Sequence, residues 1–375
     1  MNLDQLRNQI DEIDDKIVEL FVERTKIACG VAEYKKANNM AVLQSGREKA
    51  ILDKVASKVP PEMKNASRLL FTTLMDISKC RQQQLLTEAK PFPISAEKKD
   101  CPKVVTVTKG SYSADACRRF FGDNCKIEYF TDFYEVFNAV EQGEADYGVI
   151  PIENSTAGDV SETYDLMGRH NFYICKSAKI RIEHILAVKK GVKPEDVKTV
   201  MSKGIALKQC SGYIKKMGFC AEECSNTAAA AKKVAAGGGD TAAICSRSCA
   251  ELFGLEAAAE NIADIDDNYT RFIMISKKPE VSEKASIVSL SLSLPHTPGS
   301  LYSLLTRFAY CGLNLCRIES KPMPSGLAAV KDDAFDFLFY LDFVGSIQNE
   351  EVVRLLANLE KEMKYYRFLG NYEEI

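Results

Sequence analysis

Ten positions near the N-terminus alternate spacings of three and four residues without interruption, which is typical of a helix packed along one stripe against another helix. One of the ten, Arg24, is charged. A guanidinium keeps its proton and is costly to bury alone, so we expect Arg24 to meet a carboxylate from the protein or from a ligand. The ten positions are Leu3, Leu6, Ile10, Ile13, Ile17, Leu20, Arg24, Ile27, Val31 and Tyr34.

The length and composition indicate an ordinary globular chain of two or three domains. It has 375 residues, of which 46% are hydrophobic and 27% charged, and its net charge is -3. No basic excess favours nucleic acid as a partner, and no apolar run is long enough to span a membrane. The N-terminus lacks the pattern of an export signal, so we expect a cytoplasmic protein with reduced thiols.

The cysteines and glycines give no argument for a metal or an organic cofactor. The chain has 13 cysteines, and three residues separate the partners in each of the pairs Cys220/Cys224 and Cys245/Cys249. Structural zinc sites usually use pairs with two intervening residues, so we expect buried packing of small side chains here. The glycines at 237–239 predict a turn, because no phosphate-loop lysine follows them, and no GxGxxG follows a predicted strand.

The first part of the chain predicts an all-α domain over residues 1–89. It contains few helix breakers, and we expect helices at about 3–38, 45–58 and 65–88. Residues 90–103 hold three prolines and little apolar content, which predicts a linker.

The rest of the chain predicts an α/β domain over residues 104–278 and an α+β domain over 285–375. In the former, short apolar runs alternate with amphipathic stretches. The latter begins with strict polar–apolar alternation and has the order βαββαβ of ferredoxin-like domains. We expect buried α/β strands at Val104–Val107, Tyr147–Ile150, Ile185–Val188 and Ala242–Cys245, α+β strands at about 286–294, 313–321 and 335–344 plus a short last strand, and helices at about 299–311 and 348–361.

Polar side chains interrupt the apolar faces of the predicted N-terminal helices. Arg24 and Lys35 are eleven residues apart, about 20° around one helix, and Ser78 and Gln82 interrupt a face of another. A pocket lined by these cationic and polar side chains would suit a small dicarboxylate with a hydroxyl group. The alternative is that Arg24 and Lys35 pair with acidic residues in a helical dimer. The middle helix adds Arg47 and Glu48.

Residues 1–89 resemble the all-helical chorismate mutases, in which chorismate rearranges to prephenate without a nucleophile or a general acid. The resemblance implies that Arg24 and Arg47 bind substrate carboxylates and that Arg7 reaches one across a dimer. Seven positions and their spacing carry it: Arg7, Arg24, Lys35, Arg47, Glu48, Ser78 and Gln82.

The same resemblance implies the catalytic roles. Lys35 and Gln82 would donate to the ether oxygen, on which charge develops, and Glu48 would hold the hydroxyl group. Ser78 would line the site. The family often has an aspartate where this chain has Gln44, so recognition of the hydroxyl would rest on Glu48.

The α/β region carries two motifs, PIENSTAG at 151–158 directly after a predicted strand and NYTRF at 268–272 before another. Loops at the carboxyl ends of strands are where ligands bind in such sheets. With GSYS at 110–113 and Gln209, these motifs closely resemble prephenate dehydratase. The resemblance implies two α/β lobes, hinged as in periplasmic binding proteins, with the active site in the cleft.

In that family prephenate loses carbon dioxide and hydroxide to give phenylpyruvate. The resemblance implies Thr270 as the essential hydroxyl, acting as a donor or relay because threonine is a poor acid. Arg271 would bind a carboxylate. Where relatives have SHPQ, this chain retains only Ser202. The remaining substrate-binding positions would be Ser113, Glu153, Asn154, Ser155, Thr156, Gln209 and Phe272.

The C-terminal region resembles ACT regulatory domains, which bind amino acids between paired subunits. It implies L-phenylalanine as an effector, and Lys321 stands where the family has an arginine. A dimerisation sheet without a ligand is the alternative. The implied effector-binding residues are Gly299, Ser300, Leu301, Glu319 and Ser320.

Together these resemblances predict a bifunctional enzyme of phenylalanine biosynthesis that needs no cofactor and forms a homodimer or homotetramer. It would bind chorismate, prephenate and the effector L-phenylalanine. Two alternatives stay open: a nonenzymatic sensor built from the same parts, and arogenate in place of prephenate.

Overall fold

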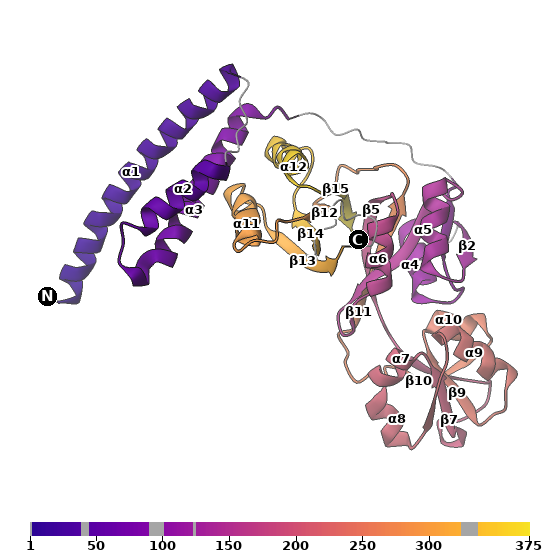
Figure 1. Cartoon of the computed structure of the whole chain (residues 1–375). Helices are drawn as coiled ribbons and strands as arrows, with labels where there is room; N and C mark the ends of the chain where they lie inside the picture. The colour runs from indigo at the N-terminus through magenta and orange to yellow at the C-terminus, as the bar shows by residue number, and fades with distance from the viewer. Residues whose placement is uncertain (1, 39–44, 90–100, 123–124, 324–336) are drawn as a thin grey trace. The chain divides into compact units, whose positions relative to one another are not determined.

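The computed structural model describes residues 2–38, 45–89, 101–122, 125–323 and 337–375 (Figure 1). The chain divides into two compact units. The first comprises residues 1–92, 290–320 and 332–367, and the second 93–289, 321–331 and 368–375.

Three helices form the N-terminal part of the first unit and confirm the predicted helices to within two residues. A capping box between Asn2 and Gln5 starts α1, which runs for 35 residues and packs against α3. Most of the predicted apolar stripe is exposed, with Leu3 at 61%, Ile13 at 54% and Leu20 at 64%. The elements are α1 (Leu3–Ala37), α2 (Ser45–Ala56), a 3-10 turn at Pro61–Met63 and α3 (Lys64–Leu86).

The C-terminal elements follow the predicted βαββαβ order, with strands arranged β13-β14-β12-β15. The last strand was predicted to be short, which is wrong: nine residues form it, because Phe368, Leu369 and Tyr372 are buried and anchor it. The elements are β12 (Ile287–Ser293), α11 (Ser300–Tyr310), β13 (Leu315–Pro322), β14 (Phe337–Val344), α12 (Glu350–Glu362) and β15 (Tyr366–Glu374).

Within the first unit, α11 and α12 pack against α3. Polar contacts hold this interface: Ser303 donates to Asp76 at 2.7 Å, and Thr87 donates to Asn358 at 2.7 Å. The helix that carries Ser78 and Gln82 is therefore in direct contact with the C-terminal helices.

The second unit contains two sheets, which form the two predicted lobes. The first lobe is built on the strand order β5-β11-β3-β1-β2, with β4 on β3. β1 pairs in parallel with β2 and β3, whereas β11 runs antiparallel to β3 and β5. Its elements are β1 (Lys103–Val107), α4 (Tyr112–Phe121), β2 (Lys126–Phe130), α5 (Phe133–Gln142), β3 (Tyr147–Asn154), β4 (Gly158–Asp159), α6 (Ser161–Arg169), β5 (Tyr173–Arg181) and β11 (Tyr269–Ser276).

The second lobe has the strand order β10-β6-β9-β7-β8. The chain passes between the lobes twice, at 182–184 and 260–268. The elements are β6 (Ile185–Val188), a 3-10 turn (Pro194–Asp196), β7 (Thr199–Ser202), α7 (Gly204–Gln209), α8 (Ser211–Met217), β8 (Cys220–Glu223), α9 (Thr227–Ala236), β9 (Thr241–Cys245), α10 (Arg247–Leu252) and β10 (Glu256–Ala259).

The first part of the predicted PIENSTAG loop belongs to a strand of the first sheet instead. The strand expected at Tyr147–Ile150 continues through Asn154, so the start of the PIENSTAG motif is paired with β11. Proline usually ends a central strand, but here the register shifts beside Pro151, and such a bulge tolerates a residue without an N–H.

The cysteine and glycine predictions concern the second lobe. Cys224, Cys245 and Cys249 are buried as expected, but the expectation is wrong for Cys220, which is exposed on β8. The glycines at 237–239 form the turn from α9 to β9. Among the described residues no group of three or more His, Cys, Asp and Glu side chains is arranged to hold a metal ion. In the same part of the chain, no helix is both long enough and apolar enough to cross a membrane.

Candidate functional site

Arg24 points from α1 at α3 without an acidic partner in the described chain. One of its guanidinium nitrogens donates to the Leu74 carbonyl at 2.9 Å and to Ser78 Oγ at 2.6 Å. Partial burial lowers the pKa of Arg24, since desolvation disfavours its charge. Within one chain, therefore, the described residues give Arg24 neutral partners, and the predicted pairing with acidic residues across a helical dimer stays a prediction.

Two further polar side chains are buried on the same pair of helices. Lys35 on α1 and Gln82 on α3 are each 9% exposed, and Ser78 is 6% exposed. Lys35, Ser78 and Gln82 are thus polar side chains buried on two helices that pack against each other.

Glu48 on α2 forms an ion pair with Lys79, the α3 residue next to Ser78. Lys79 contacts both oxygens of Glu48, at 3.0 and 3.1 Å, and Asp76 at 3.1 Å. The two carboxylates raise the pKa of Lys79 despite its desolvation. Arg47 is exposed on α2, and Gln44 lies outside the described residues.

Arg7 is too far along α1 to share a site with Arg24. Arg24 lies 17 positions after Arg7, which corresponds to about 25 Å of helix. The Arg7 side chain is 66% exposed and lies 3.8 Å from Asp4, a surface pair of little energetic weight. Within one chain, therefore, Arg7 is not brought to the predicted pocket.

The two dehydratase-like motifs meet as neighbouring strands. In the β3–β11 register Asn154 lies opposite Thr270 and Glu153 opposite Arg271. Asn154 Nδ2 donates to Thr270 Oγ1 at 2.9 Å. Because this hydroxyl oxygen already accepts a hydrogen bond, the Thr270 O–H remains able to donate to something else.

A chain of hydrogen bonds continues from Asn154 into the second lobe. Thr156 Oγ1 donates to Asn154 Oδ1 at 2.8 Å and accepts from Gln209 Nε2 at 2.8 Å. Ser155 stands beside it, with Oγ accepting from the Tyr269 amide at 2.9 Å. The polar residues of PIENSTAG, NYTRF and α7 are thus brought together.

The other predicted residues of this region have different surroundings. Arg271 forms an ion pair with Glu153 at 3.2 Å, and Ser113 is buried at the start of α4. Phe272 belongs to the apolar core of the first lobe. Ser202 is fully buried and donates to the Ile244 carbonyl at 2.6 Å inside the second sheet, so its hydroxyl is engaged away from Thr270 and Asn154.

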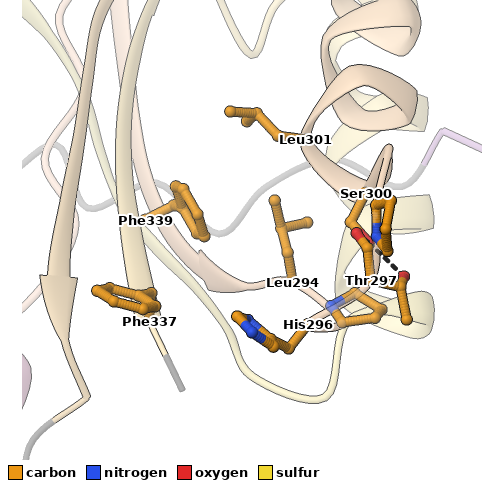
Figure 2. A pocket seen from close by; sticks show the side chains of 9 residues that line it. Leu294, His296, Thr297, Ser300, Leu301, Phe337 and Phe339 are labelled. Carbon is orange, nitrogen blue, oxygen red and sulfur yellow. Dashed lines mark hydrogen bonds between the residues drawn. The ribbon is translucent and has the colours of Figure 1, made fainter. Parts of the chain in front are cut away.

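A cavity of about 360 Å³ lies at the start of α11 in the first unit (Figure 2). Two of the predicted effector-binding residues, Ser300 and Leu301, line this cavity. A third, Gly299, connects the lining residues Pro298 and Ser300. Phe337 and Phe339 form an aromatic wall. Glu319 and Ser320 lie on β13 and do not line this cavity. Its lining is Leu294, Pro295, His296, Thr297, Pro298, Ser300, Leu301, Phe337 and Phe339.

The chain is similar to known proteins in both its N-terminal helical part and its α/β part. The chorismate mutase type II family model matches residues 6–83, and the prephenate dehydratase model matches residues 108–280. A bifunctional chorismate mutase/prephenate dehydratase of Aquifex aeolicus is 31% identical, covering 99% of this chain and 97% of its own. The chain belongs to the bifunctional chorismate mutase/prephenate dehydratase family.

Two other similar proteins match a smaller share of the chain. Arogenate dehydratase 2 of Petunia hybrida is 36% identical over 70% of this chain and 69% of its own. A prephenate dehydratase from Arthrobacter aurescens, solved in complex with L-Phe, aligns with a TM-score of 0.65 and 29% identity, covering 72% of this chain and 89% of that one.

As a member of the bifunctional family, the protein is an enzyme with chorismate mutase and prephenate dehydratase activities. This confirms the predicted enzyme and disfavours the nonenzymatic sensor. The predicted mutase residues within the described ranges lie in the first unit, and the dehydratase-like motifs lie in the second.

Three polar residues of the dehydratase region were missed from the sequence. Asn268 is 1% exposed, and its Oδ1 accepts from Asn154 at 2.8 Å. His184 is 2% exposed and lies 3.0 Å from Gln209, and Tyr112 lies beside it. Asn268 stands two residues before Thr270, which was a usable signal, whereas His184 merely precedes an apolar strand.

Proposed function

We propose that Arg24, Lys35, Ser78 and Gln82 form the chorismate mutase site, with Glu48 and Arg47 on α2. Gln44, which lies outside the described residues, is a further proposed substrate-binding residue. The observation that carries this is Arg24, a desolvated cation bound only to neutral groups within the described residues. A dicarboxylate substrate would supply the missing charge. Lys35 and Gln82 would then donate to the ether oxygen, which gains charge in the rearrangement.

The dehydratase site is proposed around Thr270. Its hydroxyl oxygen accepts from Asn154, so its proton is directed at the substrate hydroxyl that departs as carbon dioxide is lost. Ser113, Glu153, Ser155, Thr156, Gln209 and Arg271 would surround the substrate, while Phe272 and Ser202 would support the lobes from within. Prephenate is the proposed substrate, and parallel assays with arogenate would reveal a preference for the amino acid.

The proposed assembly is a homodimer, or a homotetramer made of two such dimers, in a cytoplasmic enzyme with free thiols. Two features of α1 support a second copy: its exposed apolar stripe, and Arg7, placed about 25 Å from its own Arg24. A partner helix lying antiparallel along α1 would cover the stripe and bring Arg7 to the other subunit's Arg24.

Subunit mixing tests this assembly. The Arg7→Ala and Arg24→Ala variants should each lose mutase activity. Coexpression of the two should restore about a quarter of the wild-type rate, because half of the dimers are mixed and each has one intact site of two. Coexpression of Arg24→Ala with Lys35→Ala is the matched control: both residues belong to the same side of the site, so no recovery is expected. Equal recovery in the two mixtures would contradict the shared site.

L-phenylalanine is proposed as the feedback effector of an ACT-like C-terminal domain. The cavity at α11 is of ligand size, and its aromatic wall suits a benzyl side chain. α11 has no side-chain cap, so N–H groups of its first turn are available to a carboxylate. Glu319 and Ser320 would contribute from β13, in keeping with binding between subunits.

Substitution of Gly299 tests the effector site. Gly299 has φ +88°, so alanine strains the turn although no atom blocks its Cβ. The L-phenylalanine concentration for half-inhibition of the dehydratase should rise about tenfold. Gly312→Ala is the matched control, since Gly312 also has a positive φ and open space but follows the other end of α11. A flat response of the wild-type enzyme to L-phenylalanine would reject the proposal.

A further inference from the structure

The two crossings between the lobes of the second unit contact each other. The Ile182 amide donates to the Asn268 carbonyl at 2.8 Å, which joins residues 182–184 to the return crossing at 260–268. His184 lies in the first crossing and is 2% exposed. A buried imidazole at the junction of two lobes is not explained by the proposed dehydratase roles.

His184 contacts a residue from each lobe. Its Nε2 lies 3.0 Å from Gln209 Oε1 on α7, and its Nδ1 lies 3.4 Å from the Tyr112 hydroxyl on α4. The hydroxyl proton of Tyr112 is donated to the Glu183 carbonyl at 2.8 Å, which fixes the position of the Tyr112 ring beside His184. Burial lowers the pKa of His184, so the imidazole is neutral near pH 7 and has one donor and one acceptor nitrogen.

The partners fix the direction of these hydrogen bonds. Gln209 Nε2 donates to Thr156, so its Oε1 faces His184 and must accept. The proton of His184 is therefore on Nε2. Removing that donor would leave a Gln209 oxygen without its partner and free the amide to rotate away from Thr156.

We propose that His184 is a positioning residue of the dehydratase, which holds the Gln209 amide of the second lobe so that it donates to Thr156 in the first. This rests on the proposed dehydratase site. His184 does not act through Asn154, because the backbone amides of Thr156 and Ala157 already hold Asn154 Oδ1, at 3.1 and 2.8 Å. Its effect on the reaction passes through Gln209.

A double-mutant cycle in the full chain tests this route. His184→Phe keeps a ring but removes the donor, and kcat/KM for prephenate should fall roughly 10- to 100-fold. His184→Gln places an amide N–H near the Nε2 position and should recover most of the loss. In a Gln209→Ala background, His184→Phe should cause little further change. The mutase rate of each variant measures its concentration of folded N-terminal sites, and thermal melting checks the second unit.

The outcomes separate this inference from the proposed site. If Gln209→Ala lowers kcat/KM but His184→Phe does not, the site stands and the role of His184 is wrong. If His184→Phe costs as much in the Gln209→Ala background as in the wild type, His184 acts through general packing, which also overturns the inference. If Gln209→Ala itself has no effect, both the site and the inference fail.

Discussion

Thr270→Ala should lower the dehydratase rate by about 10²- to 10⁴-fold while leaving the mutase rate of the same chain unchanged. The hydroxyl is the group whose proton is left for the substrate, because its oxygen accepts from Asn154. Alanine removes that donor and leaves the sheet intact, since the backbone of Thr270 is paired with Asn154 on one side and Ile180 on the other. The measurement is the rate of phenylpyruvate formation from added prephenate.

The conservative variant separates chemistry from packing. Thr270→Ser keeps the hydroxyl and should retain a substantial part of the activity, whereas Thr270→Val keeps the shape and should be as inactive as alanine. A Val variant with near wild-type turnover would show that the hydroxyl takes no part in the departure of the substrate hydroxyl.

Arg24→Met should lower the mutase rate by about 10²- to 10³-fold without destabilising the protein. The activity falls because the substrate carboxylate loses its cation. The free energy of unfolding should stay equal or rise, because a desolvated charge with no carboxylate partner among the described residues is replaced by an apolar chain of similar length. Chorismate consumption and urea unfolding of the same preparation measure the two effects.

Lysine at the same position provides the control. Arg24→Lys keeps the charge but loses the planar guanidinium, which can hold Leu74 and Ser78 with one nitrogen while its other nitrogens face a ligand, so we expect an intermediate mutase rate. A marked loss of stability in Arg24→Met would contradict the account, since it would mean that Arg24 serves the helix packing rather than a ligand.

Much of the fold was predictable from local patterns. Helical periodicity and the scarcity of helix breakers located all three N-terminal helices within two residues, and the spacing of Arg24, Ser78 and Gln82 predicted one wall of the proposed mutase site. The continuation of β3 past Pro151 was missed because the bulge that accommodates the proline depends on its neighbour, β11, and not on the local sequence.

The contacts that support the proposed site residues were harder to predict from the sequence. In the sequence Lys79 looks like a lysine on the solvated face of a helix. It nevertheless forms an ion pair with Glu48, because α2 packs against α3. His184 is likewise unremarkable in sequence, because a histidine before an apolar strand is usually a core residue. Both gain their partners from segments more than 20 residues away, and only the tertiary structure shows such pairs.

The central claim is that one chain converts chorismate through prephenate to phenylpyruvate with two separate sites. A time course with purified protein and chorismate alone, following all three compounds, tests it most directly. We predict loss of chorismate, a transient rise of prephenate and then accumulation of phenylpyruvate, with prephenate persisting as the end product in Thr270→Ala. Chorismate that stays unchanged, or prephenate that persists in the wild type, would contradict the account.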